Sequence, residues 1–315
     1  MQGSVNTVVL LGPTATGKTW LGVQLARHFG WEIISADSRQ VYKGLDLGSG
    51  KDIGEYSEGG SAVPYHLIDI TTLASEYNVF NFQQDFYRLF AENRKQDKMS
   101  YIVGGTGMYV DSVVRQYDLI PVPENKELHA RLMETPLEEL AKELLALKPD
   151  LHNKSDLVLK DRVVKALEIE LFKNSPEGKE VIAEKNARPK VVPFVIGNTI
   201  DRNQLRSNIE KRLFERLDQG MIEEVESLHK EFSWERLEKL GLEYRYVSLF
   251  LEGKIQSKKE MTDELYHAIC QFAKRQETWF RGMERKGVKI HWLPEENNKQ
   301  VKLNAAIDLL DSNLK

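Results

Sequence analysis

A glycine-rich loop between a predicted strand and a predicted helix is the feature that most constrains this fold. The apolar run 8–11 precedes the loop, and a helical pattern over residues 20–29 follows it. In such a loop the backbone N–H groups turn inward around phosphate oxygens, while the helix directs its positive end at the same anion. Lys18 adds a charge for the terminal phosphate, and the Thr19 hydroxyl is suited to hold Mg²⁺. The sequence therefore predicts a P-loop made of Gly12, Pro13, Thr14, Ala15, Thr16, Gly17, Lys18 and Thr19.

The loop alone does not reveal the reaction, because kinases, NTPases and other enzymes that hold a diphosphate share this cradle. The motif also matches ATP-binding proteins, and whether ATP binds stays open. An ATPase usually carries an acidic residue after a second apolar strand, but residues 101–103 are followed by Gly-Gly-Thr-Gly at 104–107. Asp69, after another apolar run, is an alternative acid. The pattern points away from ATP hydrolysis without excluding it.

Composition excludes several classes of protein. The chain has 315 residues, 41% of them hydrophobic, and no apolar run approaches the length of a membrane span. Cys270 is the only cysteine, so the chain can form neither an internal disulfide nor a zinc site built from several cysteines. The formal net charge of −4 argues against binding nucleic acid through bulk positive charge. We expect a cytoplasmic protein without membrane contact that works as a monomer.

The order of predicted elements indicates an α/β fold. Strand-like runs at 8–11, 32–35, 66–70 and 101–103 alternate with helical stretches such as 80–95, which is typical of a parallel sheet flanked by helices. Helical patterns alone follow, at 127–133, 137–147 and 157–172, until an apolar run returns at 190–197. Long helical patterns then cover 204–231, with a break expected at Gln219-Gly220, and 261–285. We predict a P-loop NTPase-like core over 1–118 and 188–315, with a small all-helical insertion over 119–187.

Two residues after predicted strands are candidates for chemistry. Asp37 follows the second strand, so it should lie at the carboxyl edge of the sheet beside the P-loop. Its carboxylate has three possible roles there: binding Mg²⁺ through water, accepting a proton, or capping the next helix. Thr106 offers a hydroxyl between glycines, which suits either a tight ligand channel or a plain turn.

A basic segment near the C-terminus is a candidate for nucleic-acid contact. Residues 274–289 mix Lys274, Arg275, Arg281 and other cations with Trp279 and Phe280. Positive charge with aromatic rings suits a nucleic-acid backbone and its bases. A solvated helix whose aromatic pair packs inward explains the same pattern equally well.

Together these motifs resemble the tRNA dimethylallyltransferases, also called tRNA isopentenyltransferases. The motifs that carry the resemblance run in order from about residue 7 to about residue 293. They are GPTATGKT at 12–19, ADSRQVYKGLDLGSGK at 36–51, HLIDI at 66–70, GGTGMY at 104–109, RVVKALEI at 162–169 and AKRQETWFR at 273–281. DSRQVYKGLD beside a P-loop is the most specific of them.

The resemblance implies transfer of the dimethylallyl group from dimethylallyl diphosphate to N6 of the adenosine 3′-adjacent to the anticodon of tRNA. Mg²⁺ would assist, and the P-loop would hold the diphosphate. Asp37 resembles the general base, Thr106 the residue at the diphosphate bridge and Arg212 the arginine on the diphosphate. The adenosine would have to be flipped out of the anticodon stem-loop. The tRNA contacts implied are Asp37, Ser38, Arg39, Gln40, Thr106, Asp161, Arg162, Lys165, Lys274, Arg275 and Arg281.

The chain departs from the family pattern in three places. Gln-Arg-x-x-Arg is replaced by residues 161–165, Thr-Arg-Gln by 269–271, and a Gly-Tyr pair appears as Gly-Leu-Glu-Tyr at 241–244. The first two changes reduce positive charge where tRNA would bind. Three alternatives therefore stay open: an adenylate-type isopentenyltransferase acting on free nucleotide, a diverged RNA-binding paralogue without activity, and a nucleotide kinase.

Overall fold

The computed structural model describes residues 4–149 and 157–314. The chain divides into two compact units, one formed by Met1–Tyr117 with Val191–Lys315 and one formed by Asp118–Lys190. Within the described ranges, no helix is both long and apolar enough to cross a membrane.

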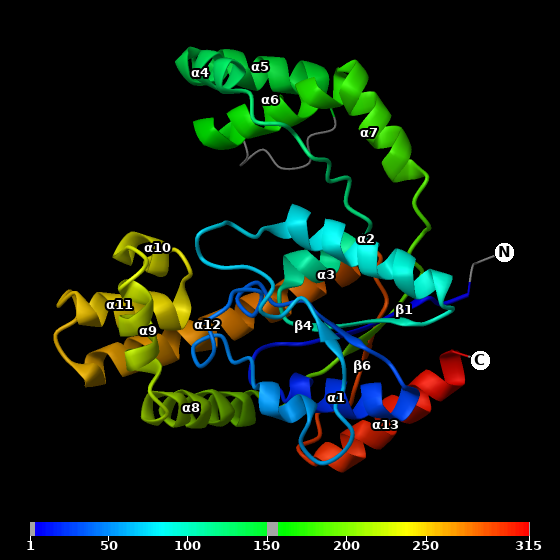
Figure 1. Ribbon diagram of the computed structural model, residues 1–315, viewed down its shortest axis with the longest axis vertical. Helices are drawn as coiled ribbons and strands as arrows, with labels where there is room; N and C mark the ends of the chain where they lie inside the picture. The colour runs from blue at the N-terminus through cyan, green and yellow to red at the C-terminus, as the bar shows by residue number, and fades with distance from the viewer. Residues whose placement is uncertain (1–3, 150–156, 315) are drawn as a thin grey trace. The chain divides into compact units, whose positions relative to one another are not determined.

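A six-stranded parallel sheet is the centre of the first unit (Figure 1). Its strand order is β3-β2-β4-β1-β5-β6, so the P-loop strand β1 lies between β4 and β5. The first three strands in the chain are β1 (Thr7–Leu11), β2 (Ile33–Ser35) and β3 (Tyr65–His66). The other three are β4 (Ser100–Gly104), β5 (Pro193–Gly197) and β6 (Ile290–Trp292). This is the α/β architecture predicted from the alternating pattern.

Helices cover both faces of the sheet because its strands are apolar on both sides. Val8 and Leu10 pack with α1 (Lys18–Phe29) and α13 (Lys299–Asn313). The alternate side chains of β1, Val9 and Leu11, share a core with α2 (Val79–Lys95), α3 (Gly107–Val114) and the C-terminal part of α12 (Lys258–Arg285). Successive strand residues point to opposite faces, so one short apolar strand serves two cores.

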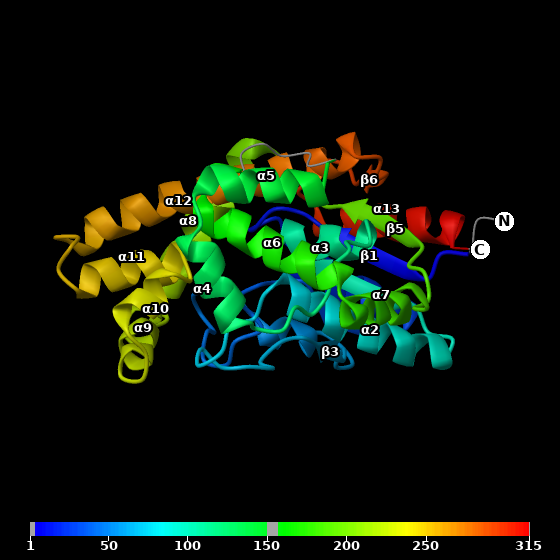
Figure 2. The same cartoon turned by 90° about the horizontal axis from the view of Figure 1, so that it is seen from above.

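The remaining helices of this unit form a lobe with its own apolar core (Figure 2). The lobe consists of α8 (Arg202–Asp218), α9 (Met221–His229), α10 (Trp234–Glu238), α11 (Leu242–Leu251) and the N-terminal part of α12. The break predicted at Gln219-Gly220 is confirmed, because Gly220 has φ 102 between α8 and α9. A left-handed glycine ends a helix without a steric penalty.

One predicted strand is wrong in its extent. Of the run 66–70 only His66 lies in a strand, as the second residue of β3, because Leu67 and Asp69 take positive φ values of 63 and 55. The carboxylate of Asp69 instead binds Lys51, whose buried ammonium group also contacts Asp46 at 2.6 Å. This cluster ties the segment after β3 to the loop that follows β2. A short 3₁₀ helix, η1 (Ile53–Tyr56), lies further along that loop.

All regular elements described in the second unit are helices. They are α4 (Lys126–Glu134), α5 (Leu137–Leu147), α6 (Lys160–Asn174) and α7 (Pro176–Asn186). A small separate core of leucine and valine holds α4, α5 and α6 together. The helix predicted over 157–172 begins later, at Lys160, and the exposed Val158 and Leu159 precede it. The boundaries predicted from sequence, 119 and 187, fall inside this unit.

Candidate active site

The loop from Gly12 to Thr19 connects β1 to α1, and its own contacts hold it open around a hollow. Ala15 and Gly17 have φ values of 61 and 75, so the backbone turns through left-handed conformations. The Thr16 hydroxyl donates a hydrogen bond to the Pro13 carbonyl at 2.9 Å, and the Lys18 ammonium group donates to the same carbonyl at 2.7 Å. Lys18 therefore lies over the loop, where a bound anion would meet it.

Side chains from distant segments fix this loop. Asn198, which follows β5, donates from its amide to the Thr16 carbonyl at 2.9 Å, and Asn208 of α8 donates to the Ala15 carbonyl at 3.1 Å. The Gly12 backbone lies so close to Asn198 that an added Cβ would meet its carbonyl oxygen at 2.3 Å. Only glycine allows this approach, which is one physical reason for the residue at the start of the motif.

Asp37 caps the turn after β2. One carboxylate oxygen accepts the N–H groups of Arg39 at 2.8 Å and Gln40 at 3.3 Å. Asp37 therefore caps a turn and not the next helix that the sequence suggested, because residues 38–41 form turns and no helix begins there. The side chain also lines the cavity beside the P-loop. Both roles are compatible because a carboxylate offers about four acceptor positions.

Thr106 and its glycines bring the loop after β4 against Asp37. The Thr106 hydroxyl accepts the N–H of Ser38 at 3.0 Å. At Gly104, an added Cβ would lie 2.3 Å from the Ala36 carbonyl oxygen. Gly104 allows the loop after β4 to lie against the loop after β2, and the hydrogen bond to Thr106 fixes the turn that carries Asp37.

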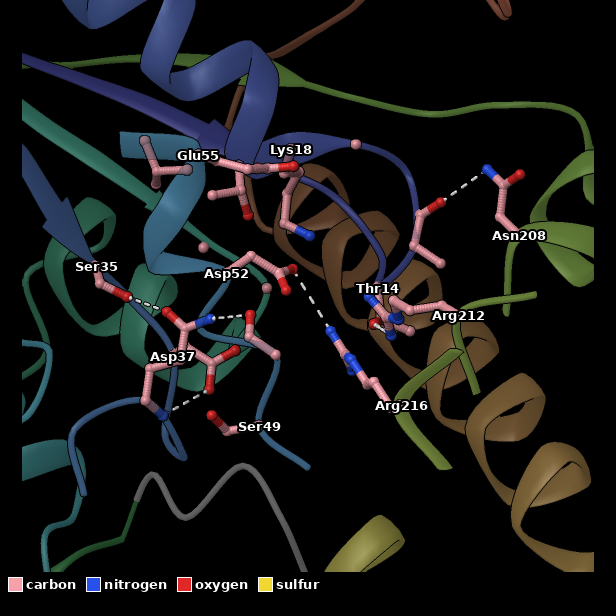
Figure 3. Close-up of a pocket in the computed structure, with 18 of the residues that line it drawn as sticks. Thr14, Lys18, Ser35, Asp37, Ser49, Asp52, Glu55, Asn208, Arg212 and Arg216 are labelled. Atoms are coloured by element: carbon pink, nitrogen blue, oxygen red, sulfur yellow. Dashed lines mark hydrogen bonds and ion pairs between the residues drawn. The ribbon is translucent and has the colours of Figure 1, made fainter. Parts of the chain in front are cut away.

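Two arginines of α8 point into the pocket beside the P-loop (Figure 3). Arg212 donates a hydrogen bond to the Thr14 hydroxyl, and Arg216, one turn later, forms an ion pair with Asp52 at 3.5 Å. The Gly50 backbone approaches Arg216 so closely that an added Cβ would lie 2.1 Å from its Nη2 atom. Since Gly50 has φ 65, glycine is favoured there for conformation as well as space.

These residues form a wall shared by two cavities of about 520 and 480 Å³. The residues that line both include Thr14, Lys18, Asp37, Gly105, Arg212 and Arg216. The first cavity adds Thr19, Ser35, Gln40 and Lys299. The second adds Ser38, Arg39, Thr106, Glu243 and Arg275. One wall with both a carboxylate and several cations thus faces two spaces.

Burial and the repulsion between neighbouring cations lower the pKa values of Lys18 and Arg212 in this wall. Burial lowers the pKa of Lys18 to about 8, although Asp37 partly offsets the effect and Arg212 adds to it. Burial also lowers the pKa of Arg212 to about 10, and the neighbouring Arg216 contributes. The site holds more positive charge than its own carboxylates neutralise, so binding an anion there would relieve the repulsion.

The loop over residues 44–51, which borders both cavities, is anchored by Glu224 of α9. Its carboxylate accepts the backbone N–H groups of Asp46 at 3.1 Å, Leu47 at 2.6 Å and Gly48 at 3.2 Å. The Tyr244 hydroxyl donates to the same carboxylate at 2.9 Å. This anchor connects the helical lobe to the loop that borders the site.

The residues predicted for tRNA contact do not all gather at the site. Arg275 lines the second cavity, but Lys274 and Arg281 line other surface hollows along α12. The Gln40 side chain is occupied within the loop, accepting from Ser35 and donating to the Gly50 carbonyl, both at 3.0 Å. Phe280 is fully buried, whereas Trp279 is 37% exposed, so the aromatic pair divides between core and surface.

The predicted contacts of the second unit all lie on α6. Asp161, Arg162 and Lys165 are exposed. Lys165 binds Glu168 at 3.2 Å, and His129 contacts the other oxygen of that carboxylate at 2.8 Å. The positive charge of Lys165 is therefore partly balanced inside its own unit.

Sequence reasoning missed several residues of the site. Asn198, Arg216, Glu243 and Gln276 come from four separate segments, and no motif singled out in the sequence contains Asn198 or Arg216. Gln276 lies within the AKRQETWFR motif, but its position beside the P-loop depends on contacts between distant parts of the chain.

The oxygen donors near the loop suit a magnesium ion that a phosphate substrate also holds. Thr19 and Asp37 both line the first cavity. Within residues 4–149 and 157–314, no cluster of three or more His, Cys, Asp or Glu side chains could bind a metal by itself. Mg²⁺ commonly takes one or two protein ligands together with substrate phosphates, so these donors fit the ion.

Comparisons with known proteins agree on one family. The sequence model of the family described as IPP transferase matches residues 40–283. A protein of Treponema denticola named tRNA dimethylallyltransferase 2 is 55% identical over 290 residues, covering 91% of this chain and 95% of its own length. A protein of Syntrophus aciditrophicus named tRNA dimethylallyltransferase 1 is 46% identical over 298 residues, covering 94% and 96%.

Solved structures support the same assignment. The full-length tRNA isopentenylpyrophosphate transferase from Bacillus halodurans matches with a TM-score of 0.70 and 28% identity, over 98% of this chain and 96% of its own. A eukaryotic dimethylallyltransferase acting on tRNA matches with a TM-score of 0.76 over 98% and 78% of the two chains, and at 20% identity it supports the fold alone. The chain belongs to the tRNA dimethylallyltransferases, a family of prenyltransferases.

Proposed function

We propose that this enzyme transfers the dimethylallyl group of dimethylallyl diphosphate to N6 of the adenosine 3′-adjacent to the anticodon of tRNA. The observation that carries the proposal is the shared wall, on which the Asp37 carboxylate lies among Lys18, Arg212 and the P-loop. A base beside an anion cradle is what this reaction needs. A tRNA substrate is met in the cytoplasm, where we expect the enzyme to work.

In this proposal the P-loop holds the diphosphate. The N–H groups around Gly17 and the start of α1 bind its oxygens, and Lys18 exchanges the Pro13 carbonyl for the anion. Arg212, already hydrogen-bonded to Thr14, adds a second cation. Preorganised donors of this kind stabilise the charge that develops on a leaving group.

The reaction forms one bond and breaks another. The adenosine N6 atom attacks C1 of the dimethylallyl group, and the bond between C1 and the diphosphate oxygen breaks with its electron pair on the diphosphate. Asp37 accepts the proton that N6 loses. The exocyclic amine is a weak nucleophile, since its lone pair is delocalised into the ring, so a positioned base contributes to the rate.

Mg²⁺, held by Thr19 together with the diphosphate, would supply further neutralisation of the leaving group. We propose that Thr106 holds the base in position, because its hydroxyl accepts the N–H of Ser38 and so fixes the turn that carries Asp37.

For tRNA we propose contacts from Ser38, Arg39 and Arg275 at the second cavity, together with Arg162 and Lys165 of α6. Phosphate contacts make such binding sensitive to salt.

The test is incubation with labelled dimethylallyl diphosphate, Mg²⁺ and bulk tRNA, followed by nucleoside analysis. N6-prenylated adenosine is the expected product. A competition between AMP and an anticodon stem-loop separates this activity from prenylation of free nucleotide. Binding of tRNA without any product would contradict the proposal, as would transfer to AMP alone.

A further inference from the structure

A second carboxylate, Glu243, lies in the wall of the second cavity and has no role in the mechanism above. It is 8% exposed and lines the cavity together with Asp37, Arg212 and Arg216. It belongs to the Gly-Leu-Glu-Tyr segment, where the chain departs from the family pattern. A buried ionisable group in a cavity is costly unless its surroundings compensate it.

The backbone holds Glu243 in this place. Gly241 and Leu242 have φ values of 76 and 44, and α11 begins at Leu242. A leucine in the left-handed region is uncommon and persists only where the surrounding structure imposes it. Tyr244, the residue after Glu243, is buried, and its hydroxyl donates a hydrogen bond to Glu224. The backbone is therefore held in place on both the N-terminal and the C-terminal side of Glu243.

Glu243 acts on the arginine pair through space. Among the described residues it forms no direct ion pair with either guanidinium group, but both arginines stabilise its charged form. Burial has the larger effect and raises the pKa of Glu243. In return, the carboxylate offsets part of the repulsion between Arg212 and Arg216. An incoming diphosphate would interact with the same two guanidinium groups.

We propose that Glu243 is a positioning residue that competes electrostatically with the diphosphate for Arg212 and Arg216, and so weakens retention of the released product. The inference rests on the proposed function, because it assumes a diphosphate at this wall. Two negative charges that share one pair of cations oppose each other's binding. Tight binding of the diphosphate aids cleavage of its bond to the dimethylallyl group but slows release of the diphosphate afterwards. The nearby Glu243 carboxylate would speed that release.

The test measures binding of inorganic diphosphate with Mg²⁺ at pH 8 by calorimetry. Glu243→Gln keeps the shape of the side chain and removes its charge, so we expect about three- to tenfold tighter binding. Glu243→Asp keeps the charge and should remain within about twofold of the unmodified enzyme. Glu226→Gln, at an exposed position of α9, is the matched control and should change nothing.

Tighter binding is informative because a misfolded variant would lose affinity rather than gain it. Product inhibition gives a second reading, since diphosphate should inhibit Glu243→Gln at lower concentration than the unmodified enzyme. If the unmodified enzyme binds diphosphate and Glu243→Gln binds it equally or more weakly, this inference is overturned while the proposed function stands. If the unmodified enzyme binds no diphosphate, the proposed function and this inference fall together.

Discussion

Gln276 accepts a hydrogen bond from the backbone N–H of Thr14 at 2.9 Å, although 262 positions separate the two residues. The same side chain donates to the Gly105 carbonyl at 2.8 Å. One buried amide from α12 therefore joins the P-loop to the loop after β4. These are the loops that carry the proposed diphosphate contacts and Thr106, so Gln276 fixes the distance between two parts of the site.

Gln276→Ala should lower kcat/KM for dimethylallyl diphosphate by about ten- to a hundredfold, because small displacements of catalytic groups are costly. The lost amide leaves the Thr14 N–H and the Gly105 carbonyl without this partner. Steady-state kinetics with tRNA in excess measure the effect. Gln300→Ala, at an exposed position of α13, is the control. Unchanged kinetics in Gln276→Ala would show that the bridge is not needed for catalysis.

Asp37→Asn separates the two roles of this side chain. Asparagine keeps an oxygen for the N–H groups of Arg39 and Gln40, so the turn should persist. It cannot accept the N6 proton as a carboxylate does, so we expect transfer to fall by about a hundredfold or more. Single-turnover transfer to tRNA measures the rate, and calorimetry with diphosphate checks the site. Asp37→Ala should lose the cap as well and unfold at a lower temperature. Near-normal transfer by Asp37→Asn would remove Asp37 as the base.

Local patterns predicted the parts of the fold that short segments determine. The P-loop with β1 and α1 was predicted because glycine spacing, an apolar strand and a helical period meet within about twenty residues. The run 66–70 misled because the contacts of Asp69 with Lys51 override its strand propensity. Strand β6 has three residues, which is too short for a period to be visible.

The site was predictable where one motif carries it and hidden where distant segments meet. Asp37 and Thr106 follow strands, so topology alone places them at the sheet edge. Arg212 came from the family resemblance, because a helix arginine has no local mark of function. Gln276 and Glu243 depend on how α11 and α12 pack against the loops, which no local pattern encodes.

Binding of diphosphate should depend on pH through Lys18. Burial lowers its pKa to about 8, and a bound anion would raise that pKa again, so the protonated form is the one that binds. The contribution of Lys18 is therefore complete well below pH 8 and is lost as the pH rises through 8 and above. Calorimetry from pH 6.5 to 9.5 should show the affinity ratio between the unmodified enzyme and Lys18→Met shrinking over this window. Dividing the affinity at each pH by that of Lys18→Met cancels the effect of protons that diphosphate itself gains or loses. A ratio that stays constant with pH would contradict the role given to Lys18.

Glu224 should be a major source of stability for the loop that borders the site. Its carboxylate accepts three backbone N–H groups and the Tyr244 hydroxyl, and hydrogen bonds to a charged group each contribute about 1.5–3 kcal/mol. Glu224→Ala leaves all four donors to find new partners, so we expect the free energy of unfolding to fall by about 2–4 kcal/mol. Urea denaturation followed by circular dichroism measures the change, with exposed Glu226→Ala as the control on the same helix.

Because the loop held by Glu224 contains Gly50 and Ser49 of the first cavity, diphosphate affinity should fall as well in Glu224→Ala. A variant as stable as the control would mean that the loop holds its conformation without this anchor.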